Sequence, residues 1–235
     1  MPTPKVNPDM YRDEVLKRLI VEDRPVILDV GANEGQSAEG FLTLFKSPTV
    51  HCFEPIPQHV ELLEATFQGQ PDVTIVPCAV SAQNGRAQFH VNAFSQSSSL
   101  EPLNELGAFR TIKNTHTVDV IDVDVISLDD YCKDANVKDI AFLKIDAQGH
   151  SADVLRGAQG LLKNRSIKLI QVEILFHNFY AKTENFSSIE AQLAHHGYRL
   201  YTIFHTDSEK IGEFAFNWSS GEIWYLDALY IRIDE

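Results

Sequence analysis

The chain has 235 residues, of which 44% are hydrophobic, and this is enough apolar material for a single α/β domain spanning 1–235. A formal net charge of −13 disfavours a nucleic acid or an anionic membrane as a partner, because their phosphates would be repelled, and it leaves a homo-oligomer open. Three cysteines without paired spacing and an N-terminus without an apolar signal segment predict a cytoplasmic protein with reduced thiols.

The stretch VILDVGANEGQSAEGF (26–41) follows an N-terminal helical segment (1–24) and combines a strand, a turn and the start of a helix. Its β-branched run predicts a strand buried on both faces, and the apolar residues after the turn recur at helical spacing. Gly31 and Gly35 can adopt backbone angles closed to other residues and let a ligand approach the main chain. The pattern predicts a cofactor loop in a doubly wound sheet, with a plain strand-to-helix turn as the alternative.

The same loop discriminates between cofactors. A dinucleotide fingerprint, G-x-G-x-x-G, fails because Asn33 and Gln36 stand where its second and third glycines belong. Glu34 would also repel a pyrophosphate. S-adenosylmethionine has no phosphate and carries a sulfonium and an ammonium, so Asp29 could hold the ammonium directly or through water. The next strand, TVHCFEP, ends in Glu54, which is placed to bind ribose hydroxyls. The loop therefore favours a methyl donor.

The remaining elements alternate as in a doubly wound fold, with a helix around 57–67 and a strand over 73–80. An inserted β-hairpin over 83–128 follows, and its Ser-rich loop (94–106) is a candidate lid. The later elements are a strand (140–146), a helix (151–163), a strand (167–175), a helix (187–196) opened by a capping box from Ser187 to Glu190, and an antiparallel final pair (198–204 and 222–233). The sequence predicts one seven-stranded, mostly parallel sheet.

Several segments together resemble the FkbM family of S-adenosylmethionine-dependent methyltransferases, from about Val26 to Ile231. They are DVGANEGQS, FEP, CAVS, ISLDDY, LKIDAQG, VLRGAQGLL, QVEILF and DALYI. The resemblance implies a class I, Rossmann-like fold with a reversed last strand, and usually O-methylation of sugar or polyketide hydroxyls. It also implies cofactor contacts at Asp29, Gly31, Asn33, Gly35, Gln36, Ser37 and Glu54, with Ala79 and Val80 beside the adenine. Gln148, where many members carry glutamate, and His150, where an aromatic residue is expected, depart from the pattern on the acceptor side.

Three residues at the carboxyl edge of the sheet are candidates for the general base that a hydroxyl acceptor requires. Asp146 ends the central strand and is predicted to be the base or a substrate anchor; the alternative is a carboxylate that caps the helix starting near Ser151. Glu173 lies in an apolar strand, where it is either a buried hydrogen-bonded acid or a substrate ligand. His177 follows that strand and is either a base or a surface histidine.

No metal site is predicted. Asp119, Asp122 and Asp124 fall on both faces of one strand, so they cannot converge on an ion. Asp129 and Asp130 could join Asp146 around a divalent ion, but the N-terminus of a helix or turn explains them better.

Three function classes compete. The favoured class is an enzyme that O-methylates a sugar, glycan or polyketide-type small molecule. A nucleic-acid base methyltransferase is disfavoured because DAQG stands where such enzymes carry D/N-P-P-Y. A catalytically silent S-adenosylmethionine-binding or interaction module remains the alternative, since a fold alone does not establish activity.

Overall fold

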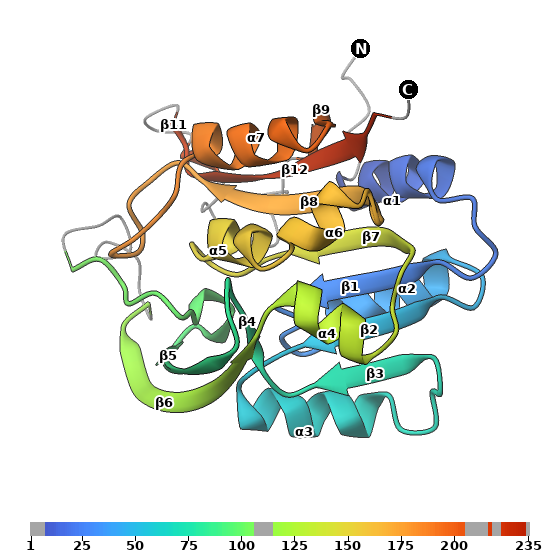
Figure 1. Ribbon diagram of the computed structural model, residues 1–235. Coiled ribbons are helices and arrows are strands. Elements are labelled where there is room, and N and C mark those ends of the chain that lie inside the picture. The colour runs from blue at the N-terminus through green and yellow to red at the C-terminus, as the bar shows by residue number, and fades with distance from the viewer. Residues whose placement is uncertain (1–7, 106–114, 205–215, 218–221, 234–235) are drawn as a thin grey trace, which may run out of the picture.

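The computed structural model describes residues 8–105, 115–204, 216–217 and 222–233, and within these ranges the chain forms a seven-stranded sheet with helices on both faces (Figure 1). The strands of this sheet are β1 (Val26–Val30), β2 (Thr49–Phe53), β3 (Val73–Val76), β7 (Ile140–Ile145), β8 (Ile167–Leu175), β9 (Tyr198–Phe204) and β12 (Tyr225–Arg232). The helices are α1 (Pro8–Leu19), α2 (Gln36–Leu44), α3 (Pro57–Thr66), α4 (Leu128–Asp134), α5 (Ser151–Arg156), α6 (Gln159–Lys163) and α7 (Phe186–His195).

The sheet has the order β3-β2-β1-β7-β8-β12-β9, and β12 alone runs against its neighbours on both sides. This confirms the prediction of a mostly parallel, seven-stranded sheet with a reversed last strand. Because β1 and β7 lie at the centre and the chain crosses to opposite sides of them, the carboxyl ends of these two strands form the crevice in which ligands of such sheets bind.

Alternating residues of the central strands face two separate hydrophobic clusters, as the period of a strand requires. Leu28 and Leu143 belong to the cluster that α4, α5, α6 and α7 cover, whereas Ile27 and Phe142 belong to the cluster that α1, α2 and α3 cover. Both faces are therefore buried, which explains why the strand sequences are continuous apolar runs.

The predicted insertion is confirmed as a β-hairpin of β5 (Gly85–Asn92) and β6 (Thr117–Ile126), which pair antiparallel. The two-residue strand β4 (Ala79–Val80) pairs in parallel with β6 and completes a second, three-stranded sheet. The short helix η1 (Ser95–Ser97) follows β5. The single strand predicted over 73–80 is therefore wrong: it divides at Pro77, which lacks the N–H needed to continue the ladder. Residue 106 of the candidate lid and residues 107–114 of the insertion lie outside the described residues.

Two predicted helices differ from the structure. The helix predicted over 151–163 is divided into α5 and α6 around Gly157. A Cβ at this position would lie 2.1 Å from the Ser81 carbonyl oxygen. The last helix begins at Phe186, and its N-cap is Asn185, whose side chain accepts the Ser188 N–H, so the predicted capping box from Ser187 is wrong.

Short elements and the cysteines complete the described chain. β10 (Phe216–Asn217) and β11 (Glu222–Ile223) form a two-stranded antiparallel ladder. Cys52, Cys78 and Cys132 are free and buried. Over the ranges that the structure describes, no helix has the length and apolar character needed to cross a membrane.

Candidate active site

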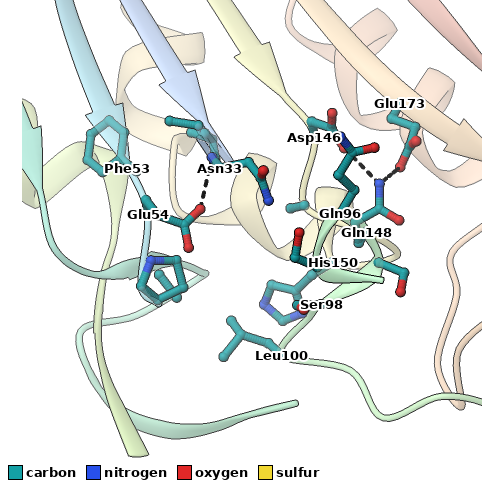
Figure 2. Close-up of a pocket in the computed structure, with 18 of the residues that line it drawn as sticks. Asn33, Phe53, Glu54, Gln96, Ser98, Leu100, Asp146, Gln148, His150 and Glu173 are labelled. Carbon is teal, nitrogen blue, oxygen red and sulfur yellow. Dashed lines mark hydrogen bonds between the residues drawn. The ribbon is translucent and has the colours of Figure 1, made fainter. Parts of the chain in front are cut away.

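A cavity of about 340 Å³ opens at the carboxyl ends of β1, β2, β7 and β8, and the insertion and β12 contribute further walls (Figure 2). This volume lies at the lower end of the range for sites that take drug-sized molecules. The cavity is lined by Gly31, Asn33, Gln36, Ser37, Glu54, Ala79, Val80, Asp146 and Glu173 among the residues that the sequence predicted for the site.

The turn after β1 is held tightly against the end of β7. The N–H groups of Gly31 and Ala32 both donate to the Phe53 carbonyl at 3.1 Å. Gly31 has a φ of +82°, and a Cβ at this position would lie 2.0 Å from the carbonyl oxygen of Asp146, so only glycine fits. Asn33 follows in the left-handed region with a φ of 50°, and its buried Oδ1 has no hydrogen-bond partner among the residues that the structure describes. The turn thus presents a polar atom that a ligand can satisfy.

Glu54 is a fixed carboxylate in the cavity wall. It is buried, and its two oxygens accept the backbone N–H groups of Asn33 and Ile56, each at 2.9 Å. His59 Nδ1 lies 3.5 Å from the same carboxylate, and its hydrogen bond to Glu54 raises the pKa of the His59 imidazole. Each carboxylate oxygen keeps a lone pair for a further donor, which suits a ligand that carries neighbouring hydroxyls.

An apolar wall adjoins Glu54. It is formed by Phe53, Ile56, Cys78, Ala79, Val80 and Phe89. Burial raises the pKa of the Cys78 thiol to about 12, so this side chain stays a neutral, apolar part of the wall. The wall and the carboxylate together offer one flat apolar face and one hydrogen-bonding group, the combination that a nucleoside needs.

Asp29 lies behind the cavity rather than in its wall. Its carboxylate is fully buried, and its Oδ1 lies 3.3 Å from Nζ of Lys144, a cavity residue that also lies 3.4 Å from Asp146 Oδ2. Burial raises the pKa of Asp29 even though Lys144 opposes the shift. Burial also works against the charge of Lys144, but attraction to Asp29 and Asp146 outweighs it and raises the lysine pKa. The predicted direct contact of Asp29 with a cofactor ammonium does not fit this arrangement, because the partner of Asp29 is Lys144.

Besides Glu54, the cavity wall contains three acids, Asp146, Glu173 and Asp227, and Figure 2 shows the first two on the opposite side from Glu54. Gln148 Nε2 donates to Asp146 Oδ1 and to Glu173 Oε2, both at 2.8 Å (Figure 2). Glu173 stands directly opposite Asp227 in the antiparallel pairing of β8 and β12. Burial, followed by repulsion from Asp146 and Asp227, raises the pKa of Glu173 well above its usual value. Burial and Asp146 likewise raise the pKa of Asp227 to about 6.

The alternative explanation of Asp146 as a helix cap does not hold. The N-terminus of α5 lies at His150 and has no side-chain cap, whereas the Asp146 carboxylate lines the cavity and bonds Gln148. Of the two other acids discussed as metal ligands, Asp129 accepts the N–H groups of Gly160 and Leu161 at the start of α6. The prediction that a helix N-terminus explains Asp129 is therefore confirmed.

Besides Asp29, two residues predicted for the site, Gly35 and His177, lie outside the cavity wall. Gly35 has a φ of +97°, and a Cβ there would lie 2.9 Å from the side chain of Leu63, so this glycine permits the close packing of α2 on α3. The His177 ring lies 5.7 Å from the ring of Trp224 and 6.0 Å from that of Phe179. Those two aromatic residues line the cavity and His177 does not, which removes the geometric basis for a base at His177.

Sequence reasoning missed much of the wall on the side of the three acids. The residues that it did not identify are Thr115, Lys144, Leu175, Phe179, Trp224, Tyr225 and Asp227, whereas Phe94, Ser95, Gln96, Ser97, Ser98 and Leu100 belong to the loop that it predicted as a candidate lid. A lysine in the otherwise apolar run IAFLKID could have indicated a buried ion pair. The aromatic and serine residues come from the insertion and the last strand, whose placement no local pattern reveals.

His150 connects the insertion to the body of the domain. Its Nδ1 lies 2.9 Å from Glu101 Oε1, and its Nε2 lies 2.8 Å from Ser81 Oγ. Glu101, His150 and Asp153 are close enough to share an ion. However, both ring nitrogens of His150 are engaged, and Asp153 accepts from Lys182 at 2.7 Å and also pairs with Arg156, so the cluster is satisfied as an ion-pair network.

Comparison with known proteins identifies the family. The model of the methyltransferase FkbM domain matches residues 29–200, which is most of the chain and runs from within β1 to within β9. The chain belongs to the FkbM methyltransferase family. A curated relative, the 2-O-methyltransferase NoeI of Sinorhizobium fredii, is 30% identical over 158 residues, which cover 63% of this chain and 64% of NoeI. The match therefore spans just under two thirds of that relative.

Solved structures support the fold of this FkbM protein. A protein of Listeria monocytogenes assigned as an S-adenosylmethionine-dependent methyltransferase superposes with a TM-score of 0.52 at 7% identity, over 94% of this chain and 97% of the other. An rRNA methylase of Streptococcus thermophilus superposes with a TM-score of 0.51 at 9% identity, over 99% and 100% of the two chains. At these identities the likeness establishes the class I methyltransferase architecture alone.

The cofactor of this FkbM protein is S-adenosylmethionine, and the cavity fits it. The turn at Gly31 has no room for a side chain, Asn33 presents an unsatisfied Oδ1, and Glu54 presents a carboxylate beside an apolar wall. The acids on the other side suit the positive charge that a methyl donor carries on its sulfonium and ammonium.

Proposed function

We propose that this protein is an O-methyltransferase whose acceptor is a hydroxyl of a sugar, a glycan or a polyketide-type small molecule. The observation that carries the proposal is the pair Asp146 and Glu173, which lie in the cavity wall and are joined by the amide of Gln148. A hydroxyl is a poor nucleophile until a base accepts its proton, and carboxylates in a partly buried site can do this near neutral pH. NoeI, a 2-O-methyltransferase, supports the same reaction type.

The donor occupies the side of the cavity formed by the turn after β1. Glu54 binds the ribose hydroxyls, Ala79 and Val80 lie against the adenine, and Asn33, Gln36 and Ser37 contact the remaining polar groups. Bound S-adenosylmethionine supplies an electrophilic methyl group on its sulfonium. The fixed geometry of Glu54, which two backbone N–H groups orient, means that little ordering is required when the donor binds.

The acceptor occupies the side formed by the acids and the aromatic residues. Phe179, Trp224 and Tyr225 offer flat apolar surface for a ring or a chain, and over the described part of the chain the buried Nε1 of Trp224 has no hydrogen-bond partner. A hydroxyl oxygen of the acceptor can satisfy that N–H group. As the C–O bond forms and the bond between the methyl carbon and the donor sulfur breaks, releasing S-adenosylhomocysteine, Asp146 or Glu173 would accept the proton of the reacting hydroxyl.

A transfer screen tests this proposal. Purified protein is incubated with isotopically labelled S-adenosylmethionine and panels of oligosaccharides, polyketide alcohols and structured RNA, and labelled products are detected by mass spectrometry. Label on a saccharide or polyketide hydroxyl that depends on Glu173, by comparison with Glu173→Gln, supports the proposal. Label on RNA alone would replace it with a nucleic-acid methyltransferase. Cofactor binding without label in any panel would favour a catalytically silent module.

A further inference from the structure

The side-chain amide of Gln148 is the centre of a hydrogen-bond network that joins both sides of the acceptor region. Its Nε2 donates to Asp146 Oδ1 and to Glu173 Oε2 at 2.8 Å each, and its Oε1 lies 2.9 Å from the hydroxyl of Tyr180. Tyr180 is almost fully buried, and its hydroxyl also lies 2.9 Å from the carbonyl oxygen of Ser97 in the insertion. One amide group thus contacts two carboxylates and one phenol.

The chemistry of these neighbours fixes which way the amide points. Carboxylates of Asp146 and Glu173 can only accept, so they require the NH₂ end of Gln148, and its two hydrogens serve one carboxylate each. The Tyr180 hydroxyl lies at the oxygen end of the amide, and its single hydrogen can be donated to this oxygen or to the Ser97 carbonyl. The reverse orientation would place the amide oxygen against two carboxylate oxygens, with no hydrogen between them.

The backbone at Gln148 is held in a conformation that few residues adopt. Gln148 has a φ of 47° and Gly149 a φ of +87°, and a left-handed conformation is sterically unfavourable for a residue with a side chain. Two contacts keep the turn in place: Ser99 Oγ donates to the Gln148 carbonyl at 2.7 Å, and the ring of Tyr180 packs where a Cβ on Gly149 would lie 2.7 Å away. The insertion and Tyr180 therefore impose the position from which the Gln148 side chain reaches the acids.

We propose that Gln148 is a positioning residue: its amide, which also contacts Tyr180, holds the carboxyl groups of Asp146 and Glu173 side by side, facing the acceptor. This inference rests on the proposed function for the use made of the two acids. It assigns Gln148 no contact with the reacting atoms. Its role is to supply the hydrogen bonds that a charged carboxylate needs when it is removed from water.

The surroundings of Glu173 explain why such a residue is needed. Glu173 belongs to a set of ionisable groups that influence one another and come from several elements. The others are Asp146 at the end of β7, Lys144 in β7, Asp227 in β12, Asp29 in β1, Tyr180 in the segment after β8 and Arg12 in α1. Acids outnumber cations in this set. The hydrogen bond from Gln148 lowers the pKa of Glu173 against the larger upward effect of burial and of the neighbouring acids. Without this donor, Glu173 binds a proton up to a higher pH.

Urea unfolding measured across a range of pH tests the inference without any acceptor or cofactor. The test variant is Gln148→Met, which keeps the length of the side chain and removes the amide; Gln70→Met, at an exposed position outside the cavity wall, is the matched control. The folded-state pKa of Glu173 lies above its unfolded value, so the folded protein loses stability as the pH rises through that interval. In Gln148→Met the interval extends to higher pH.

The expected result is that the ratio of the unfolding equilibrium constants of Gln148→Met and wild type depends on pH. Relative to wild type, the unfolding equilibrium constant of Gln148→Met should increase as the pH rises from the folded-state pKa of Glu173 in wild type to that in the variant, by about tenfold for each unit by which this pKa has moved. Tyr180→Phe, which leaves the amide free to turn, should change in the same direction by a smaller factor. The ratio for Gln70→Met should be constant, because a loss of packing alone acts equally at every pH.

Two results would overturn the inference. One is a constant ratio of Gln148→Met to wild type across this range of pH. The other is a ratio that still rises with pH when Asp146→Asn and Glu173→Gln are introduced into wild type and into Gln148→Met alike, since the titrating groups would then lie elsewhere. If Gln148→Met does not fold, Tyr180→Phe carries the same comparison. Because no methyl transfer is measured, failure here leaves the proposed O-methylation intact, and failure of the transfer screen leaves this proton measurement valid.

Discussion

The stability of a Lys144 variant tests how the buried charges beside the cavity are stabilised. Its ammonium lies between Asp29 and Asp146, at 3.3 and 3.4 Å. The Asp29 side chain is 0% exposed, whereas that of Asp146 is 37% exposed. Lys144→Met keeps most of the buried volume and removes the charge, so the Asp29 carboxylate is left in the protein interior without its cation while Asp146 can still be solvated.

The expected loss follows from which partner is buried. Removing one member of a buried ion pair typically costs about 3–5 kcal/mol, because the other charge stays desolvated and unpaired. A domain has a total stability of about 5–15 kcal/mol, so Lys144→Met should be close to unfolding in mild denaturant. Adding Asp29→Asn removes the unpaired charge and should recover stability, with a coupling free energy of about 1–3 kcal/mol.

Urea unfolding of the four proteins of this cycle, followed by circular dichroism at neutral pH, measures the prediction. Lys46→Met is the control, since Lys46 pairs with Asp23 at 3.0 Å on the surface, with 76% and 82% of the two side chains exposed, and such a pair contributes no more than about 1 kcal/mol. A loss in Lys144→Met as small as that of Lys46→Met would refute the reasoning. So would a double variant that is no more stable than Lys144→Met.

Three further predictions concern the cavity itself. Glu54→Ala should weaken S-adenosylmethionine binding by about 1.5–3 kcal/mol, the usual loss for hydrogen bonds to a charged group, and equal calorimetric affinities would contradict the assignment. Gly31→Ala should abolish donor binding and destabilise the fold, because its Cβ would lie 2.0 Å from the Asp146 carbonyl oxygen, whereas Gly40→Ala, with open space around its Cβ, should not weaken binding. Asp227 has a folded-state pKa of about 6, above its unfolded value, so the free energy of unfolding of the wild type should fall by up to about 3 kcal/mol between pH 4 and pH 7. Asp227→Asn should remove most of that fall. An unchanged pH dependence in Asp227→Asn would show that another group titrates.

The donor side of the cavity could be predicted from the sequence because local rules govern it. A buried strand, a glycine turn and a helix start follow one another within sixteen residues, and the carboxyl edge of a parallel sheet collects what comes after each strand. Gly31, Asn33, Glu54, Ala79 and Val80 all lie in the cavity wall as expected. Gly35 was misplaced because a left-handed glycine serves helix packing and ligand approach equally well, and sequence cannot separate the two.

The acceptor side could not be predicted because non-local pairing creates it. Asp227 comes to Glu173 only through the antiparallel register of β12 on β8, and a shift of one residue would turn it to the other face. Trp224 precedes the same strand, and Ser97 reaches Tyr180 through the folding of the insertion. His177 was predicted at the edge because it follows a strand, but the aromatic contacts of the loop turn it away from the wall.

The most direct test of O-methylation is the position of the transferred methyl group. A single turnover with trideuteriomethyl S-adenosylmethionine, a responsive acceptor from the saccharide and polyketide panels, and product analysis by nuclear magnetic resonance locates the label atom by atom. The structure predicts one labelled methyl ether, formed about 10²–10⁴-fold more slowly in the variant, Asp146→Asn or Glu173→Gln, that lacks the general base, with donor affinity nearly unchanged. Label on nitrogen or carbon, or wild-type rates in both variants, would contradict the assignment of these carboxylates to an O-methyltransferase.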